Sequence, residues 1–310
     1  MASFARTGAG IAALGLLAAC GAGTGDDIRF GSNGVPYADG SANFSGGVGD
    51  GTVFTVPVKG MFSNEGDEVI LGEFDSNAQV TMGETAGGTL FVRRININGV
   101  VFDFDSADNN DDPGSGLLYQ LDSLRQVLGA RNPGAYSDAL NLYTFDGGIY
   151  EELFFVLGLE TDPAGLPRLG SATYEGPYAA YGVIQFNGIY DGDFSSEGEI
   201  SLVVDFSDEE VRGEVNALYS DIDIGTSQNV TWEITNGDLN GNRFDGDLGV
   251  MSAIYSCTNN CVDDSTIEGR LYGPDHDEAS GTSVIDGKVT FAGGTEIELQ
   301  GVGGFVGERD

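Results

Sequence analysis

Short runs in which apolar and polar residues alternate fill the C-terminal half of the chain. In each run every second residue is apolar, as in a half-buried β-strand, whose successive side chains point to opposite faces. The clearest runs begin at Leu202, Val211 and Val230. Short strands at this close spacing predict an antiparallel sheet and leave little room for helices.

Turn-forming dipeptides separate these runs. Asn or Asp followed by Gly supplies the positive φ angles of a two-residue hairpin turn. The chain has three such pairs between its runs, at Asn236-Gly237, Asn240-Gly241 and Asp286-Gly287. Closing a series of hairpins into a barrel removes its exposed edges. We therefore expect an all-β protein with an eight-stranded antiparallel barrel over residues 166–310.

The segment before the barrel is predicted to be a second β-rich domain, residues 51–165. It has strand-like runs at 68–74, 78–82, 89–98, 100–105, 140–145 and 153–157. Between them, leucines recur at steps of three and four from Leu117 to Leu128, and Gly129 and Pro133 follow as stop signals. This spacing predicts one amphipathic helix packed on the sheet.

The N-terminus resembles that of an exported bacterial lipoprotein. Arg6 precedes an apolar run from Ile11 to Leu17, which is shorter than the ~20 residues of a membrane-spanning helix. Leu17, two alanines and Cys20 match the four positions of the lipobox. That resemblance implies that residues 1–19 are removed and that Cys20 carries lipid, including an acyl chain such as palmitate. The alternative is an ordinary cleaved signal peptide with a chance cysteine.

Residues 20–50 are rich in Gly, Ser, Ala and Asp and have no sustained apolar period. This composition predicts a flexible tether between the lipid on Cys20 and the folded part. Gly21 stands where inner-membrane lipoproteins have Asp, which favours the outer membrane as the location of the anchored protein.

The net charge of −36 limits the partners of the folded part. With 49 acidic and 13 basic residues, the surface repels nucleic acid and anionic lipid, so we expect neither as a partner. Such a surface attracts a basic protein or a cation. Solubility alone is the simpler explanation, because net charge determines solubility and association rather than a site.

The two remaining cysteines, Cys257 and Cys261, lie close together in the sequence. A zinc site would need two further Cys or His ligands, and the chain has one histidine, His276. In an exported protein we therefore expect a Cys257–Cys261 disulfide at a loop tip rather than a metal site. The sequence indicates no metal and no other cofactor.

His276 lies among acidic residues in the sequence Pro274-Asp275-His276-Asp277. We expect an imidazole that faces solvent and whose pKa is raised by the neighbouring carboxylates. A haem or metal ligand is the alternative, but a single histidine without Cys or Met companions makes a poor site. No nucleophile elbow accompanies it, so we expect a protein that is not an enzyme.

The densest acidic run has the spacing at which a calcium loop begins, with Asp108, Asn110 and Asp112. Pro113 and Tyr119 replace the glycine and the glutamate of an EF-hand, which excludes that motif. A solvated acidic loop is favoured over a weak calcium site.

Aromatic residues gather near the predicted start of the barrel, at Tyr174, Tyr178, Tyr181, Phe186 and Tyr190. They could be contact residues for a ligand. Strand tyrosines more often bury the ring and leave the hydroxyl in water, and we favour that interpretation.

Two groups of motifs resemble the barrel of transferrin-binding protein B-like surface lipoproteins. The first comprises Gly158-Leu159-Glu160-Thr161, Leu166-Pro167 and Gly170-Ser171-Ala172-Thr173-Tyr174-Glu175-Gly176. The second comprises Gly269-Arg270-Leu271-Tyr272-Gly273-Pro274, Asp277-Glu278-Ala279-Ser280-Gly281-Thr282 and Gly303-Gly304-Phe305-Val306-Gly307. These positions are structural landmarks of strands and turns, so they identify the scaffold and leave the ligand-binding residues unknown.

The resemblance implies an eight-stranded barrel beside a handle-like domain, with the chain acting as an outer-membrane lipoprotein. It further implies that the chain is a binding protein whose ligand is a protein or an iron source. Its expected partner is that protein ligand or an outer-membrane receptor. We expect any role in iron uptake to involve a protein partner rather than free haem, because haem needs an axial ligand in an apolar pocket. The alternative is a structural or adhesive acidic surface lipoprotein without a specific ligand.

Overall fold

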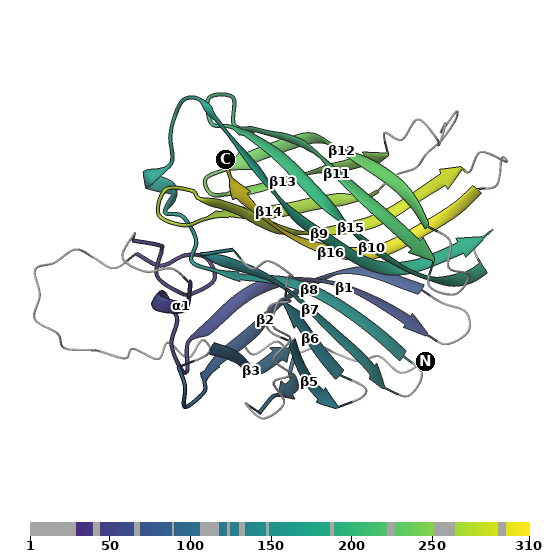
Figure 1. Ribbon diagram of the computed structural model, residues 1–310, viewed down its shortest axis with the longest axis horizontal. Helices are drawn as coiled ribbons and strands as arrows, with labels where there is room; N and C mark the ends of the chain where they lie inside the picture. The colour runs from purple at the N-terminus through teal and green to yellow at the C-terminus, as the bar shows by residue number, and fades with distance from the viewer. Residues whose placement is uncertain are drawn as a thin grey trace, which may run out of the picture.

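The computed structural model describes residues 29–39, 44–64, 69–88, 90–105, 118–122, 125–129, 134–146, 149–186, 189–221, 227–250, 264–290 and 296–310. Two β-structures lie side by side in Figure 1, a curled sheet from the first half of the chain and a closed barrel from the second. We call the curled sheet the handle.

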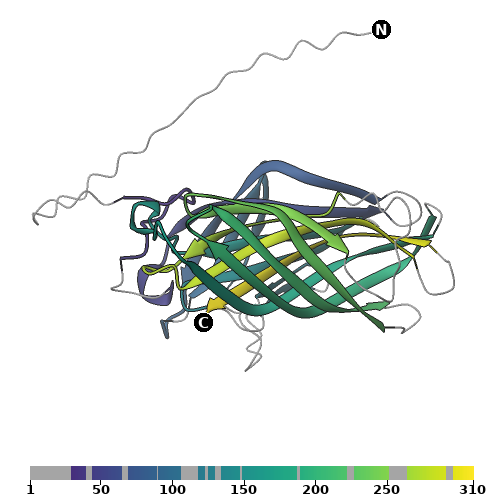
Figure 2. The ribbon, with the colours of Figure 1, turned by 90° about the horizontal axis from the view of Figure 1, so that it is seen from above.

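Eight antiparallel strands form the barrel. They are β9 (Ser171–Phe186), β10 (Ile189–Asp205), β11 (Glu210–Asp221), β12 (Ser227–Asn240), β13 (Arg243–Val250), β14 (Thr266–Tyr272), β15 (Glu278–Thr290) and β16 (Glu296–Arg309). Each strand pairs with the next, and β16 pairs with β9 to close the sheet. Figure 2 shows the tilt of the barrel strands. The predicted eight-stranded barrel is confirmed.

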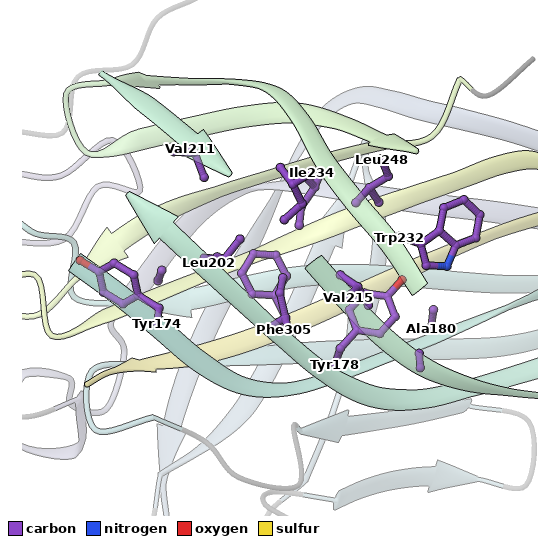
Figure 3. Packing of buried hydrophobic residues seen from close by; sticks show 14 of the residues in the cluster. Tyr174, Tyr178, Ala180, Leu202, Val211, Val215, Trp232, Ile234, Leu248 and Phe305 are labelled. Carbon is purple, nitrogen blue, oxygen red and sulfur yellow. The ribbon is translucent and has the colours of Figure 1, made fainter. Parts of the chain in front are cut away.

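Large aromatic side chains fill the barrel interior. Tyr174, Phe194, Trp232, Phe244 and Phe305 are fully buried there, and Figure 3 shows the rings of Tyr174, Trp232 and Phe305 entering the interior from different strands. The alternation expected from the sequence is confirmed, since Leu202, Val204, Val215 and Ile234 are also buried. Side chains that fill the interior leave the outer wall as the surface available to a ligand.

The tyrosine hydroxyls of the barrel differ from the prediction. Tyr174 and Tyr178 bury their rings as expected, but their hydroxyl groups are buried too. The Tyr174 hydroxyl lies 2.9 Å from Nδ1 of His276, and that of Tyr178 lies 3.0 Å from Oγ of Ser283. Each hydroxyl therefore has a protein partner in place of water.

The handle is one sheet with the strand order β4-β3-β2-β1-β8-β7-β6-β5. Its strands are β1 (Val53–Asn64), β2 (Val69–Glu84), β3 (Leu90–Ile97), β4 (Val100–Asp103), β5 (Leu118–Asp122), β6 (Arg125–Gly129), β7 (Ser137–Asp146) and β8 (Ile149–Gly158). The alternation did not indicate β1, which contains Pro57. Its ladder with β2 is irregular between Pro57 and Lys59, where a residue without an N–H group is tolerated.

The prediction of a helix between Leu117 and Leu128 is wrong. This segment forms the antiparallel strands β5 and β6, and β6 continues the handle by pairing with β7. The open edge of β7 offers backbone hydrogen bonds to a neighbouring strand, and such tertiary pairing overrides local leucine spacing. The described residues contain only two short helices, α1 (Phe44–Gly47) and the 3₁₀ turn η2 (Pro163–Gly165).

The described residues before β1, 29–39 and 44–52, pack on the handle and on the connection that follows it. Asn33 is buried and donates from Nδ2 to the Gly158 carbonyl at 2.7 Å. The side chains of Val35 and Val48 are buried in the handle core. Within the described ranges, no helix has the length and apolar character needed to span a membrane.

Candidate functional site at the handle–barrel junction

The two β-structures meet along one broad face. Strands β1, β7 and β8 of the handle contact β15 and β16 of the barrel, so the face that β8 presents outward is covered (Figure 1). On this face the Phe154 and Tyr181 rings stack with centroids 6.2 Å apart. Met61 and Val302 are buried beside them. This apolar contact fixes the handle against the barrel.

A second cluster lies along the same face, with Val156 of the handle packed against Tyr272 and Val306 of the barrel. Gly158 makes this packing possible, because a Cβ at that position would overlap the Tyr272 ring. Burial raises the pKa of Tyr272, so its hydroxyl remains protonated at physiological pH.

Glu160 is the centre of a polar network where the handle leads into the barrel. Its side chain is only 1% exposed, and its carboxylate accepts from Arg270 Nη1 at 2.5 Å, Ser32 Oγ at 2.8 Å and Ser32 N at 3.1 Å. Nδ2 of Asn242 is 3.3 Å from the same carboxylate. The carboxylate thus joins the N-terminal segment, the connection between the two β-structures and the barrel wall. These donors offset the cost of burying the carboxylate.

Backbone bonds hold the same connection on the barrel. Thr161 N donates to the Leu271 carbonyl at 2.9 Å, and Thr161 Oγ1 donates to the Gly273 carbonyl at 2.7 Å. Glu160 forms an isolated bridge with Tyr272. The connection is therefore hydrogen-bonded to the end of β14 and is held against the barrel.

Glu278 on β15 reaches from the barrel to the handle. It accepts from Tyr136 N at 2.9 Å and from Ser137 Oγ at 2.7 Å, while Ser137 Oγ lies 2.6 Å from Oγ of Ser280. Burial raises the pKa of Glu278. These bonds add a second polar contact between the two β-structures.

A cleft of about 270 Å³ opens beside this junction. Its charged lining residues are Lys59 from β1, Arg243 from β13, Glu268 and Arg270 from β14, and Glu160. One carboxylate oxygen of Glu268 lies 3.5 Å from Lys59 Nζ and 3.4 Å from Arg243 Nη2. The cleft thus brings a lysine of the handle close to two arginines and a carboxylate of the barrel and to the carboxylate of the connection.

A carboxylate of the handle has an unusual environment elsewhere on the junction. Glu152 lies two residues before Phe154 on β8, so the two side chains belong to the same face of the strand. Its carboxylate accepts from Asn141 Nδ2 at 2.6 Å. The pKa of Glu152 is raised to about 8, chiefly by burial and also by the negative charge of Asp193 on β10, against the lowering effect of the Asn141 hydrogen bond. At neutral pH the Glu152 carboxyl is therefore largely protonated, which lets it lie near Asp193 without repulsion.

Most site residues named from the sequence lie outside the described residues. These are Cys20, Cys257, Cys261 and the acidic run around Asp108, so lipidation, the disulfide and the calcium alternative stay predictions. Among the residues described, no group of three His, Cys, Asp or Glu side chains is arranged to hold a metal ion.

The prediction for His276 is wrong. The residue is 6% exposed, and its imidazole packs against the Phe206 ring with centroids 4.9 Å apart. Burial lowers its pKa below 6.5, and the Arg309 guanidinium lowers it further, against the opposite effect of Asp277. The turn folds back over the barrel end, so the imidazole faces the protein although it lies between acidic residues in the sequence.

The junction residues were not identified as a site from the sequence. Glu160 and Arg270 lie inside the motifs that carry the family resemblance, but nothing in those motifs pairs two residues 110 positions apart. Lys59 gave the clearest signal that could have been used, since a lysine interrupts an otherwise apolar run from Val56 to Met61.

The barrel sequence matches a known family. Residues 166–306 match the family described as the C-lobe and N-lobe beta barrels of Tf-binding protein B. No curated protein matches the chain.

Among solved structures, a point mutant of Transferrin Binding Protein B from Haemophilus parasuis Hp5 is 15% identical over 82% of this chain and 44% of that chain, with a TM-score of 0.44. Isotype 1 Transferrin binding protein B from serogroup B Neisseria meningitidis is 13% identical over 82% and 43%, with a TM-score of 0.42. The N-lobe domain of Lactoferrin Binding Protein B of Moraxella bovis is 10% identical over 81% and 99%, with a TM-score of 0.37.

The chain thus spans less than half the length of the first two structures. These likenesses are too distant to carry an argument about function. The sequence match of the barrel is specific, and it agrees with the motifs found in the sequence. Over residues 166–306, somewhat less than half of the chain, the sequence therefore matches the family of Tf-binding protein B beta barrels.

Proposed function

We propose that this protein is a binding protein of the bacterial outer membrane, anchored through lipid on Cys20, whose ligand is a protein or an outer-membrane receptor. The observation that carries the proposal is the match of residues 166–306 to the barrels of Tf-binding protein B, a family named for binding a protein. The docked handle supports it, because the two β-structures together offer a large, rigid surface.

The filled barrel favours a protein over a small molecule as ligand. Trp232, Phe244 and Phe305 occupy the interior and are at most 1% exposed. An eight-stranded barrel is just wide enough for such side chains to fill. A ligand therefore meets the outer wall, the handle or the loops, and these surfaces suit the extended contact area of a protein partner.

The outer barrel wall favours a ligand with a basic surface. Glu214 and Glu233 lie directly opposite each other on β11 and β12, and both are exposed. Like charges in this position destabilise a sheet, so a cationic partner would relieve repulsion as it binds. The net charge of −36 acts in the same direction at long range. Free haem, with its anionic propionates, is not the ligand that we propose.

A capture experiment with residues 26–310 tests the proposal. The immobilised domain is exposed to proteins of the native growth environment, and to purified transferrin as one defined case. We expect one stoichiometric partner with a basic surface, retained at physiological salt. The proposal fails if every retained protein elutes in proportion to its charge alone. Mass spectrometry of the membrane-extracted N-terminus tests the anchor, and an unmodified Cys20 would contradict it.

A further inference from the structure

The junction cleft is a locally basic site in an acidic protein. Three of the chain's 13 basic residues line it, namely Lys59, Arg243 and Arg270. Two carboxylates, Glu160 and Glu268, line it as well, so the formal charge of the lining is +1 while that of the whole chain is −36. The positive side chains come from both β-structures, Lys59 from the handle and the two arginines from the barrel.

Two of these cations face each other across one ladder. Arg243 on β13 is paired directly with Arg270 on β14, and both point outward from the barrel. Like charges in directly opposed positions destabilise a sheet unless an anion neutralises them. Arg270 has such an anion, the buried Glu160 carboxylate at 2.5 Å.

Arg243 has weaker compensation. Its side chain is 55% exposed, and Nη2 lies 3.4 Å from the Glu268 oxygen that Lys59 Nζ approaches at 3.5 Å. Both distances exceed the roughly 2.7–2.9 Å of a charge-assisted hydrogen bond. Arg243 also lines the cleft, so its guanidinium, with five N–H donors, is within reach of a group bound there.

We propose that the cleft binds a carboxylate group carried by a peptide, with Arg243 as its principal contact. The planar guanidinium presents two parallel donors, which match the two oxygens of a carboxylate. A volume of about 270 Å³ holds the carboxylate and a short aliphatic stem, and Val156 and Tyr272 supply an apolar wall. A monoanion matches the local charge of +1, whereas a phosphate dianion exceeds it in a protein of strongly negative charge.

Binding of a defined probe tests this proposal without reference to the protein ligand. The probe is N-acetyl-dialanine with a free C-terminal carboxylate, and its C-terminal amide is the matched control. Both are titrated into residues 26–310 while the arginine Nε–Hε signals are followed by NMR. We expect the acid to shift the Arg243 signal saturably, with affinity about tenfold or more above that of the amide, because hydrogen bonds to a charged group are the stronger ones.

Variants locate the site. Arg243→Ala should reduce the affinity for the acid about tenfold or more, whereas Arg212→Ala, which removes an exposed arginine of β11 outside the cleft, should leave it unchanged. Far-UV circular dichroism verifies that both variants fold. Equal binding of acid and amide, or equal loss in the two variants, would overturn the proposal. Tighter binding of inorganic phosphate than of the acid would overturn the assignment to a carboxylate. If the proteome capture fails while the acid binds, the proposed function fails and this inference stands.

Discussion

Arg270 on β14 and Glu160 on the connection between handle and barrel form an ion pair in which the carboxylate is almost fully buried. Removing one member of a buried pair leaves the other charge without compensation, which typically costs about 3–5 kcal/mol. Ser32 and Asn242 also donate to Glu160, so we expect the loss of unfolding free energy on removal of Arg270 to be smaller than for a carboxylate with no other donor.

We expect Arg270→Ala to lower the free energy of unfolding by about 2–4 kcal/mol. Arg243→Ala is the matched control, because it removes an exposed arginine from the opposite position of the same ladder and should cost about 1 kcal/mol or less. Urea unfolding followed by tryptophan fluorescence measures both. Equal losses in the two variants would show that burial of the pair does not matter.

The barrel wall predicts a sharp difference between two glycines. A Cβ at Gly281 on β15 would overlap the Glu268 carbonyl oxygen of β14, whereas a Cβ at Gly249 on β13 meets no atom within 4 Å. We expect Gly281→Ala to lower the unfolding free energy by about 2–4 kcal/mol, because the overlap involves backbone that cannot rotate away. Gly249→Ala should change it by less than about 1 kcal/mol. Similar effects in thermal unfolding would contradict the close approach of β14 and β15.

The barrel was predictable from the sequence, because strands such as β10, β11 and β12 have one face in the core and a more exposed face opposite it. Leu202, Val204 and Ile234 therefore leave a two-residue period that is visible without a structure. The strands of the handle were harder to predict, because the same two-residue period requires one exposed face. Its β1 strand is covered on both faces, by the handle core at Val58 and by the barrel at Met61, so alternation is lost.

The junction could not be derived from sequence patterns. Lys59 meets Glu268 only after the two β-structures dock, and Glu160 meets Arg270 only when the connection pairs with the end of β14. No local period encodes such pairs, since the residues are far apart along the chain. The burial of His276 has a similar origin, because Phe206 covers its ring from another part of the barrel.

The cysteine pair outside the described residues gives a chemical prediction. We expect Cys257 and Cys261 to be disulfide-bonded in protein secreted to an oxidising compartment. Because the loop is short, its entropic contribution is below the ~3 kcal/mol of a 15-residue loop. Thiol labelling under denaturing conditions, with and without prior reduction, measures the pairing. Two labelled thiols before reduction would refute it.

Glu152 predicts a loss of stability towards alkaline pH. Burial raises its pKa from 4.5 to about 8, so the folded protein holds this proton over a range in which the unfolded chain has released it. Stability from this group is complete below pH 4.5 and is lost as the pH rises through 8. Glu152→Gln should be more stable than wild type at pH 8.5 by about 1–3 kcal/mol and nearly equal at pH 4.5.

Urea unfolding at both pH values tests this prediction for Glu152. The control is Glu84→Gln, which removes an exposed carboxylate of the handle strand β2 and should show no comparable change between the two conditions. If Glu152→Gln were equally stable relative to wild type at pH 4.5 and pH 8.5, the carboxyl would titrate in the same way in the folded and unfolded chain.

His276 predicts the opposite dependence on pH, and the chain allows a direct measurement because it has a single histidine. Burial and Arg309 lower its pKa below 6.5, so the unfolded chain binds a proton that the folded protein rejects. Stability from this group is therefore present above pH 6.5 and is lost as the pH falls through the lower, folded value. NMR titration of the imidazole signals should give a midpoint below 6.5 in the folded protein.

His276→Asn should reduce the loss of unfolding free energy between pH 7.5 and pH 5, because asparagine does not titrate and tolerates the positive φ of 49° at this position. Tyr174→Phe is the companion variant. It removes the hydroxyl that lies 2.9 Å from Nδ1 while it keeps the ring in the barrel, so the imidazole titration should remain but its midpoint should move. A midpoint at or above 6.5 in wild type would show that the turn carboxylates, and not burial, determine the charge of His276.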